Sequence, residues 1–262
     1  MTIVLIAIAC YLAGTGLLVR GLRQEDRRIP AAVWALPAAA IALHVAAHAW
    51  AWHAAGGANL HLVSALSIVG LGMAILTWVV GVRGRMAALG VIVFPIAALT
   101  ALAYGLLGRN EPSGLDWRLQ LHAWSALLAY VTLAMAAVLA VLLWLQERAL
   151  RQRRFVDWLR ALPPLVELEI LLFRTIATGF VLLTAALLSG VLFVEDLLAQ
   201  HLAHKTVFSL LSWLGFGALL LGRRLRGWRG TTAVRWTLLA MGFLVLAFFG
   251  SNVVLELILQ RR

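Results

Sequence analysis

Cysteine and charge are both scarce in this sequence. Cys10 is the only cysteine among 262 residues, so no internal disulfide can form, and neither a CxxC redox pair nor a CxxCH haem-attachment site is present. Asp, Glu, Lys and Arg make up 13% of the chain, whereas a soluble domain carries about 25%. The composition therefore excludes thiol redox chemistry within the chain and argues against a soluble globular protein.

Motifs of stand-alone catalysis are missing as well. The sequence has no HExxH metal pattern and no glycine-rich phosphate loop. It also shows no evident pairing of a nucleophile with a base. We therefore expect a protein that is not an enzyme in its own right.

Long apolar runs dominate what is present. Hydrophobic residues make up 63% of the chain, and a membrane-spanning helix needs about 20 mostly apolar residues in succession. The pattern predicts an all-α, polytopic transmembrane helix bundle in one membrane domain, residues 1–262, with its first four helices within 1–107. Eight runs are long enough to span, at residues 2–20, 30–52, 61–82, 86–107, 119–146, 170–195, 204–222 and 236–258.

The distribution of basic residues predicts the orientation. Seventeen of the 22 Lys and Arg residues fall on one side of the predicted membrane, within 20–28, 83–85, 147–174 and 223–235. The positive-inside rule places this side in the cytoplasm and both termini outside. If one of the weaker runs, 30–52 or 61–82, lay on the membrane surface instead, every later assignment would reverse.

This distribution also accounts for the net charge of +11. The basic residues lie in short connections between apolar runs, which indicates topology and not nucleic-acid binding. We expect a multi-pass protein of the bacterial cytoplasmic (inner) membrane whose surroundings are the lipid bilayer.

The histidines gather on the side predicted to be external. Clustered imidazoles commonly bind borderline metals and haem iron. His44 and His48 share one helix face, and we interpret them more readily as polar residues facing the bundle interior than as a metal pair. The segment with His201 and His204 is either a ligand-binding mouth or an outer loop with weak ion pairs. The seven histidines are His44, His48, His53, His61, His122, His201 and His204.

The stretch Asp116–Tyr130 contains the strongest candidate site. A charged segment gives way there to an apolar run, and His122 lies about one helical turn inside the change. Tyr130 follows eight residues later, about 80° around the helix, so the two side chains share broadly one side. His122 is either an interfacial histidine bonded to loop backbone or a ligand that faces a cofactor.

From His122 to Asn252 the chain resembles the cytochrome c assembly family, and most of all its small eight-helix inner-membrane branch, the YpjD-like proteins. The matching residues keep the family's order, spacing and placement on helices. They are His122 with Tyr130, Arg174-x4-Gly179-Phe180-x3-Thr184-x5-Gly190, His204-Lys205 with Trp213, Gly227-Trp228-Arg229-Gly230, and Gly242-Phe243 followed by Gly250-Ser251-Asn252.

The resemblance implies that residues 119–258 form the assembly-like core and that the protein binds or presents haem near the outer membrane face. His122 would be one axial ligand of the iron, and His204 or the pair His44 and His48 the other, with Tyr130 at the cofactor. Other membrane or cytochrome c maturation proteins would be the partners. Arg109, Arg118 and Lys205 could pair with haem propionates.

One departure from the family favours a different function. The family presents haem through a tryptophan-rich outer segment, but residues 193–206, FVEDLLAQHLAHKT, contain no tryptophan. A non-haem, permease-like or accessory membrane subunit that keeps the fold without haem delivery is therefore the alternative.

Overall fold

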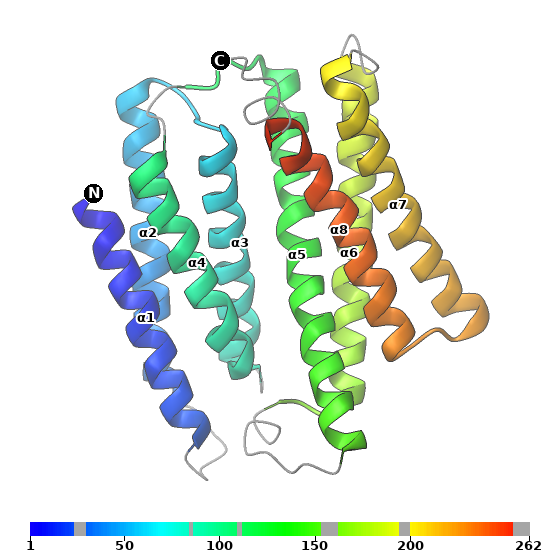
Figure 1. Cartoon of the computed structure of the whole chain (residues 1–262). Helices are drawn as coiled ribbons and strands as arrows, with labels where there is room; N and C mark the ends of the chain where they lie inside the picture. Colours follow the sequence, from blue (N-terminus) through cyan, green and yellow to red (C-terminus); the bar gives the residue numbers. More distant parts are fainter. Residues whose placement is uncertain (24–29, 84–85, 109–111, 153–161, 194–199, 254–262) are drawn as a thin grey trace. The chain divides into compact units, whose positions relative to one another are not determined.

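The computed structural model describes residues 1–23, 30–83, 86–108, 112–152, 162–193 and 200–253. These residues form helices and no strand (Figure 1). A short 3-10 turn, η1 (Ala31–Trp34), leads into the second helix. The α-helices are α1 (Thr2–Arg23), α2 (Ala35–Ala55), α3 (Leu62–Arg83), α4 (Ala87–Leu107), α5 (Trp117–Arg151), α6 (Leu165–Phe193), α7 (Gln200–Arg226) and α8 (Thr231–Val253).

Each of these helices contains a stretch long and apolar enough to cross a membrane. The predicted all-α transmembrane fold with eight spans is thereby confirmed. The longest helix, α5, has 35 residues, which at 1.5 Å per residue is about 52 Å. The hydrocarbon core is about 30 Å thick, so α5 is longer than the core that it would cross.

The chain divides into two compact units. Unit 1 contains residues 1–114 and 149–164, and unit 2 contains residues 115–148 and 165–262. Unit 1 therefore holds α1 to α4, and unit 2 holds most of α5 together with α6 to α8. A single membrane domain over residues 1–262 stays a prediction.

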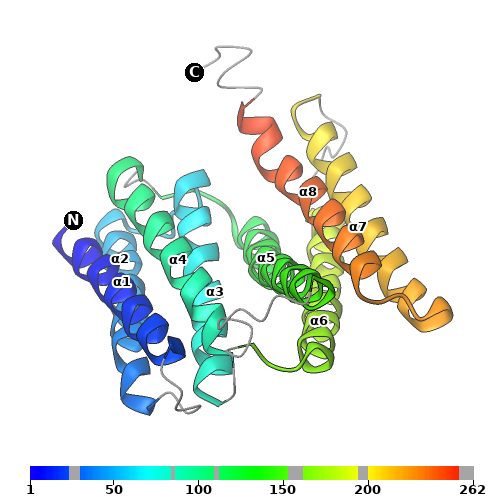
Figure 2. The same ribbon diagram turned by 60° about the horizontal axis from the view of Figure 1, so that its bottom comes forward.

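In unit 1, α4 packs against α1 and α3, while α2 packs against α1 and α3. Figure 2 shows these four helices from another side. Tyr11, Leu18 and Phe94 are fully buried in this unit. The ring of Tyr11 stacks on that of Phe94 with centroids 5.9 Å apart. Trp78 Nε1 donates to the carbonyl of Trp34 at 3.1 Å, which fixes η1 against α3.

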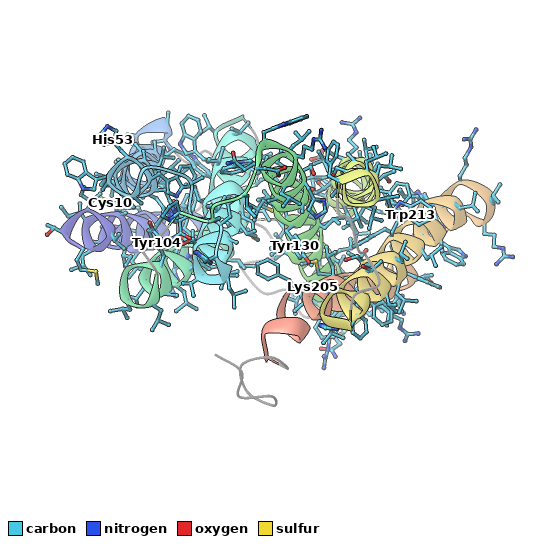
Figure 3. The ribbon with its side chains drawn as sticks, turned by 90° about the horizontal axis from the view of Figure 1, so that it is seen from above. Cys10, His53, Tyr104, Tyr130, Lys205 and Trp213 are labelled. Carbon is cyan, nitrogen blue, oxygen red and sulfur yellow. The ribbon has the colours of Figure 1, made fainter. Side chains whose placement is uncertain are left out.

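In unit 2, residues that carry the family resemblance form the joint between α6 and α7. Trp213 Nε1 donates to Thr184 Oγ1 at 2.9 Å, and the Trp213 ring stacks on Phe180 at 5.5 Å. Figure 3 shows Trp213 on α7 and Tyr130 on α5. The spacing of Phe180 and Thr184 by four residues places both on one face of α6, and this face receives the indole.

The turn between α7 and α8 is held by charge and aromatic contacts. Arg223 pairs with Glu169 and also donates to the carbonyl of Trp228 at 3.3 Å. The Trp228 ring stacks on Trp236 at 5.5 Å. Gly227 and Gly230 have φ angles of 64° and 56°, a region that suits glycine far better than residues with a Cβ. The turn sequence Gly-Trp-Arg-Gly therefore connects two antiparallel helices through a short loop.

Candidate functional site

His122 lies near the start of α5 and faces the last turns of α6. Its Nδ1 is 3.0 Å from the carbonyl oxygen of Ala186 and 3.1 Å from Ser189 Oγ. The Ser189 hydroxyl in turn donates to the same carbonyl at 2.9 Å. Two helices therefore hold the imidazole in a fixed orientation.

These contacts decide which nitrogen of His122 carries the proton. A carbonyl oxygen can only accept, and the single proton of Ser189 is already donated to it, so Nδ1 must be the donor to both oxygens. In the neutral ring Nε2 then holds the lone pair. A metal-ligating histidine is usually arranged in this way, with one ring nitrogen donating to a carbonyl and the other facing the metal.

Gly190 leaves room beside the ring. A Cβ at this position would lie 3.1 Å from His122 Cε1, closer than an ordinary van der Waals contact. The same Cβ would lie 3.5 Å from Nδ1 and 4.0 Å from Nε2 of His122, so the space that a side chain would fill borders the edge of the ring between Cε1 and Nδ1. The pair Ser189-Gly190 therefore supplies both a hydrogen-bond partner and clearance for the imidazole.

His204 lies in the first turns of α7, at the same end of unit 2 as His122. Its Nε2 is buried and has no hydrogen-bond partner among the described residues. Lys205 follows it, and Figure 3 shows Lys205 on α7. Arg118 lies over the ring of Trp117, with its guanidinium carbon 5.5 Å from the ring centroid. Arg109 lies outside the described residues, and the side chain of His201 is not described.

Tyr130 uses its hydroxyl to fasten one helix to another. The hydroxyl donates to the carbonyl of Leu244 on α8 at 2.8 Å, and the ring lies 5.2 Å from that of Phe248. Neither contact involves His122. The role of Tyr130 at a cofactor stays a prediction, while its hydrogen bond from α5 to α8 is observed.

His44 and His48 lie within unit 1, and both are buried. Their rings stack with centroids 5.4 Å apart, as the spacing of four residues on one helix predicts. The Nε2 atoms of both rings bond to Ser67 Oγ on α3, at 2.8 and 3.1 Å. This arrangement agrees with the prediction that both histidines are polar residues facing the interior of a helix bundle.

Reasoning from the sequence did not identify the partners of these histidines. Gly190 was identified only as part of the pattern that resembles the family, and neither Ser189 nor Ser67 was identified as a partner of a histidine. The carbonyl of Ala186 could not be found from sequence, because every residue has one. A serine or glycine on an apolar helix face opposite a histidine is the signal that could have found Ser67, Ser189 and Gly190.

Comparison with known proteins now defines the class. The family model described as Cytochrome C assembly protein matches residues 52–259. This span covers most of the chain and includes His122, Ser189, Gly190 and His204. The chain therefore belongs to the cytochrome c assembly protein family.

The particular relatives agree with that assignment. Inner membrane protein YpjD of Escherichia coli (strain K12) is 31% identical over 97% of this chain and 98% of its own length. Cytochrome c biogenesis protein CcsA of Synechococcus sp. (strain WH7803) is 31% identical over 33% of this chain and 28% of its own length. CcsA of Chlamydomonas reinhardtii is 26% identical over 54% of this chain and 39% of its own length. No solved structure matches the chain.

The expected location follows from the same observations. The helices long enough to cross a bilayer and the likeness to an inner membrane protein over nearly the whole chain make this a multi-pass inner membrane protein. The orientation of its termini is not among these findings and stays a prediction.

Proposed function

We propose that this protein binds haem at the end of unit 2 where α5 begins, with His122 Nε2 as an axial ligand of the iron. The observation that carries the proposal is the hydrogen bond between His122 Nδ1 and the Ala186 carbonyl at 3.0 Å. It fixes the proton on Nδ1 and leaves the nitrogen that iron requires. Membership of a cytochrome c assembly family supports the choice of haem among the possible ligands of a histidine.

Other side chains of unit 2 support this choice of ligand. Haem supplies an iron that binds imidazole nitrogen and carries two propionates. His204 offers a second nitrogen, because its buried Nε2 lacks a partner among the described residues, and an orphaned buried nitrogen is costly unless a ligand satisfies it. Lys205 and Arg118 supply cationic groups for the propionates. The apolar helices α5 and α6 would exclude water from the iron.

Haem presentation to cytochrome c maturation partners is a further part of the proposal. By the predicted orientation, His122 and His204 lie at the outer membrane face, where such partners would receive haem. The segment between α6 and α7 lacks tryptophan, and this favours the alternative of an accessory subunit without haem delivery. A protein without haem would favour the accessory role, whereas bound haem would support the first function and leave delivery as the next question.

The first experiment is an absorption spectrum with a pyridine haemochrome assay, on protein purified in mild detergent from haem-replete cells. We expect a Soret band with haem near one equivalent, and a loss of about tenfold or more in His122→Ala, because an axial ligand is removed. His53→Ala is the matched control, since His53 is exposed at the end of α2.

Two results would contradict the proposal. A folded wild-type protein without haem would favour the accessory subunit. A His122→Ala protein with full haem would show that another residue is the ligand. Size-exclusion profiles of both variants must match that of the wild type, so that a loss of haem is not a loss of fold.

A further inference from the structure

Unit 1 contains a buried polar cluster that the proposed haem site does not use. Tyr11, His44, His48 and Ser67 are exposed by only 0, 1, 3 and 0%, respectively. They come from three helices, α1, α2 and α3. Ionisable groups inside a membrane bundle are costly, and they usually mark a pathway, a relay or a ligand. A cluster of this kind within an apolar four-helix unit therefore calls for a function.

The four side chains form one continuous chain of hydrogen bonds. Tyr11 Oη and His44 Nδ1 are 3.4 Å apart. His44 Nε2 and Ser67 Oγ are 2.8 Å apart, and Ser67 Oγ and His48 Nε2 are 3.1 Å apart. Every member can both donate and accept a proton, which is the property that a proton relay needs.

The serine forces the two histidines into opposite tautomers. Ser67 has one proton and can donate to only one Nε2, so the other Nε2 must donate to it. If Tyr11 donates to His44, then His44 donates from Nε2, Ser67 donates to His48, and His48 carries its proton on Nδ1. In the reverse arrangement His48 donates from Nε2, Ser67 donates to His44, and His44 donates from Nδ1 to Tyr11. These two neutral arrangements alone make all three bonds.

The ends and the surroundings of this hydrogen-bonded chain indicate whether the cluster is a proton relay or a cation-binding site. His48 Nδ1 is buried without a partner among the described residues, and so is the hydroxyl of Tyr104, whose ring stacks on His48 at 4.2 Å. The buried polar residues described for this unit include no carboxylate. A bound metal cation would stay uncompensated there, which is strongly unfavourable, whereas a neutral chain of donors and acceptors keeps no net charge.

We propose that Tyr11, His44, Ser67 and His48 form a proton relay inside unit 1. Both ends are buried, so exchange with water takes place when the structure around an end opens locally. A water molecule then gives one proton to the Tyr11 oxygen, and His48 Nδ1 gives one proton to another water molecule. Between these ends, the Tyr11 proton moves to His44 Nδ1, the His44 Nε2 proton moves to Ser67, and the Ser67 proton moves to His48 Nε2. Each passage transfers one proton, moves no electron and exchanges one arrangement for the other, so a second passage in the same direction requires the first arrangement to be restored by reorientation of the rings and hydroxyls. The relay does not depend on haem.

The Tyr11 link is the longest of the three contacts, so it is the weakest hydrogen bond of the chain. We therefore expect transfer between Tyr11 and His44 to limit the relay. The other two contacts lie at ordinary hydrogen-bond distances. Ser67 is the centre of the relay because both histidines depend on its single hydroxyl.

The test uses the full-length protein in detergent with ¹⁵N-labelled histidine, and His44→Ala and His48→Ala identify the two sets of signals. In the wild type, ¹⁵N shifts must report complementary tautomer populations, so that the fractions of His44 and of His48 protonated at Nε2 add up to one. Exchange of the His44 ring proton in D₂O should slow by about tenfold or more in Ser67→Ala, because the path that carries protons between His44 and the His48 end is then broken and His44 itself must be exposed by local opening. Ser67→Thr keeps the hydroxyl and should restore the wild-type rate.

Ser64→Ala is the matched control, because Ser64 is a buried serine one turn away on α3 and no contact places it in the chain. If both histidines show the same tautomer, or if Ser67→Ala exchanges at the wild-type rate, the relay is wrong. Should Ser67→Ala fail to fold, Tyr11→Phe replaces it. That variant must shift the tautomer populations of His44 and His48 in opposite directions. An unchanged tautomer population of His48 would equally overturn the proposal.

Discussion

At the scale of single residues, the partner of each imidazole decides what its other nitrogen can do. The Nδ1 of His122 donates to a carbonyl, so its Nε2 is left for a ligand. Both nitrogens of His44 are bonded to side chains. His44 can therefore pass a proton, whereas His122 can hold a metal. The two proposals thus give the same residue type two different chemical roles in one chain.

The first prediction concerns the space that Gly190 leaves beside His122. In Gly190→Ala the new methyl would lie 3.1 Å from His122 Cε1, so the ring must shift or tilt away from its position. Such overpacking costs about 1–3 kcal/mol, and we expect haem affinity to fall by about tenfold. Titration of the apoprotein with haem, followed at the Soret band, measures the change.

The matched control for this variant is Gly242→Ala on α8, where an added Cβ meets nothing within 4 Å. It should bind haem like the wild type. If Gly190→Ala binds haem as tightly as Gly242→Ala, the position of the His122 ring beside Gly190 has no part in the binding site.

How much of the site could be predicted from sequence depends on the kind of partner. His122 could be found, because a histidine one turn inside an apolar run is conspicuous. Its orientation could not, because it depends on the Ala186 carbonyl, which is 64 residues away in the sequence and has no side-chain signal. Likewise, the spacing of His44 and His48 predicted their shared face but not that Ser67 would bond to both.

At the scale of helices, hydropathy predicted the existence of each span but not all of its ends. The run 119–146 lies within α5, which continues to Arg151, because a helix can continue with polar residues after it leaves the bilayer. The run 170–195 begins later than α6, which starts at Leu165. The first turns of α6 include Glu169, and its carboxylate is satisfied by Arg223. An ion pair between distant residues cannot be read from a hydropathy pattern.

The second prediction concerns the close approach of α3 and α4. An added Cβ at Gly70 would lie 2.1 Å from Thr100 Oγ1 and 3.4 Å from the Cα of Ala97. The backbone of α4 cannot move aside without disturbing its packing on α1. We expect Gly70→Ala to destabilise the protein by about 1–3 kcal/mol, measured as a lower thermal unfolding midpoint in detergent. Close helix packing at small residues is a common basis of association in membranes.

Gly16→Ala is the control for this variant, since a Cβ at Gly16 on α1 meets nothing within 4 Å. Its midpoint should equal that of the wild type or rise slightly, because alanine favours a helix. Equal midpoints for Gly70→Ala and Gly16→Ala would mean that the contact between α3 and α4 does not limit stability.

At the scale of the whole molecule, the chain is two helical units in one membrane protein. Unit 1 holds the hydrogen-bonded chain around Ser67, and unit 2 holds His122 and most of the residues that match the family. The family model begins at residue 52, within α2, so unit 1 is covered only in part. The two proposals can therefore be tested separately, because neither uses a residue of the other.

The last prediction concerns the orientation of the whole chain. Eight spans would place both termini on the same side, and the sequence predicts 17 of the 22 basic residues on the opposite side. The positive-inside rule then predicts external termini. An alkaline phosphatase domain fused after Arg262 should be active. A green fluorescent protein fused at the same position would be exported by the same route and should be dark. The same reporters in the turn between α7 and α8 should give the opposite pattern, because Arg223, Arg224 and Arg226 precede that turn.

A complete reversal would invert the orientation and move His122 and His204 to the cytoplasmic face, which would rule out haem presentation at the outer surface. Identical signals at both positions would instead show that α8 does not cross the membrane.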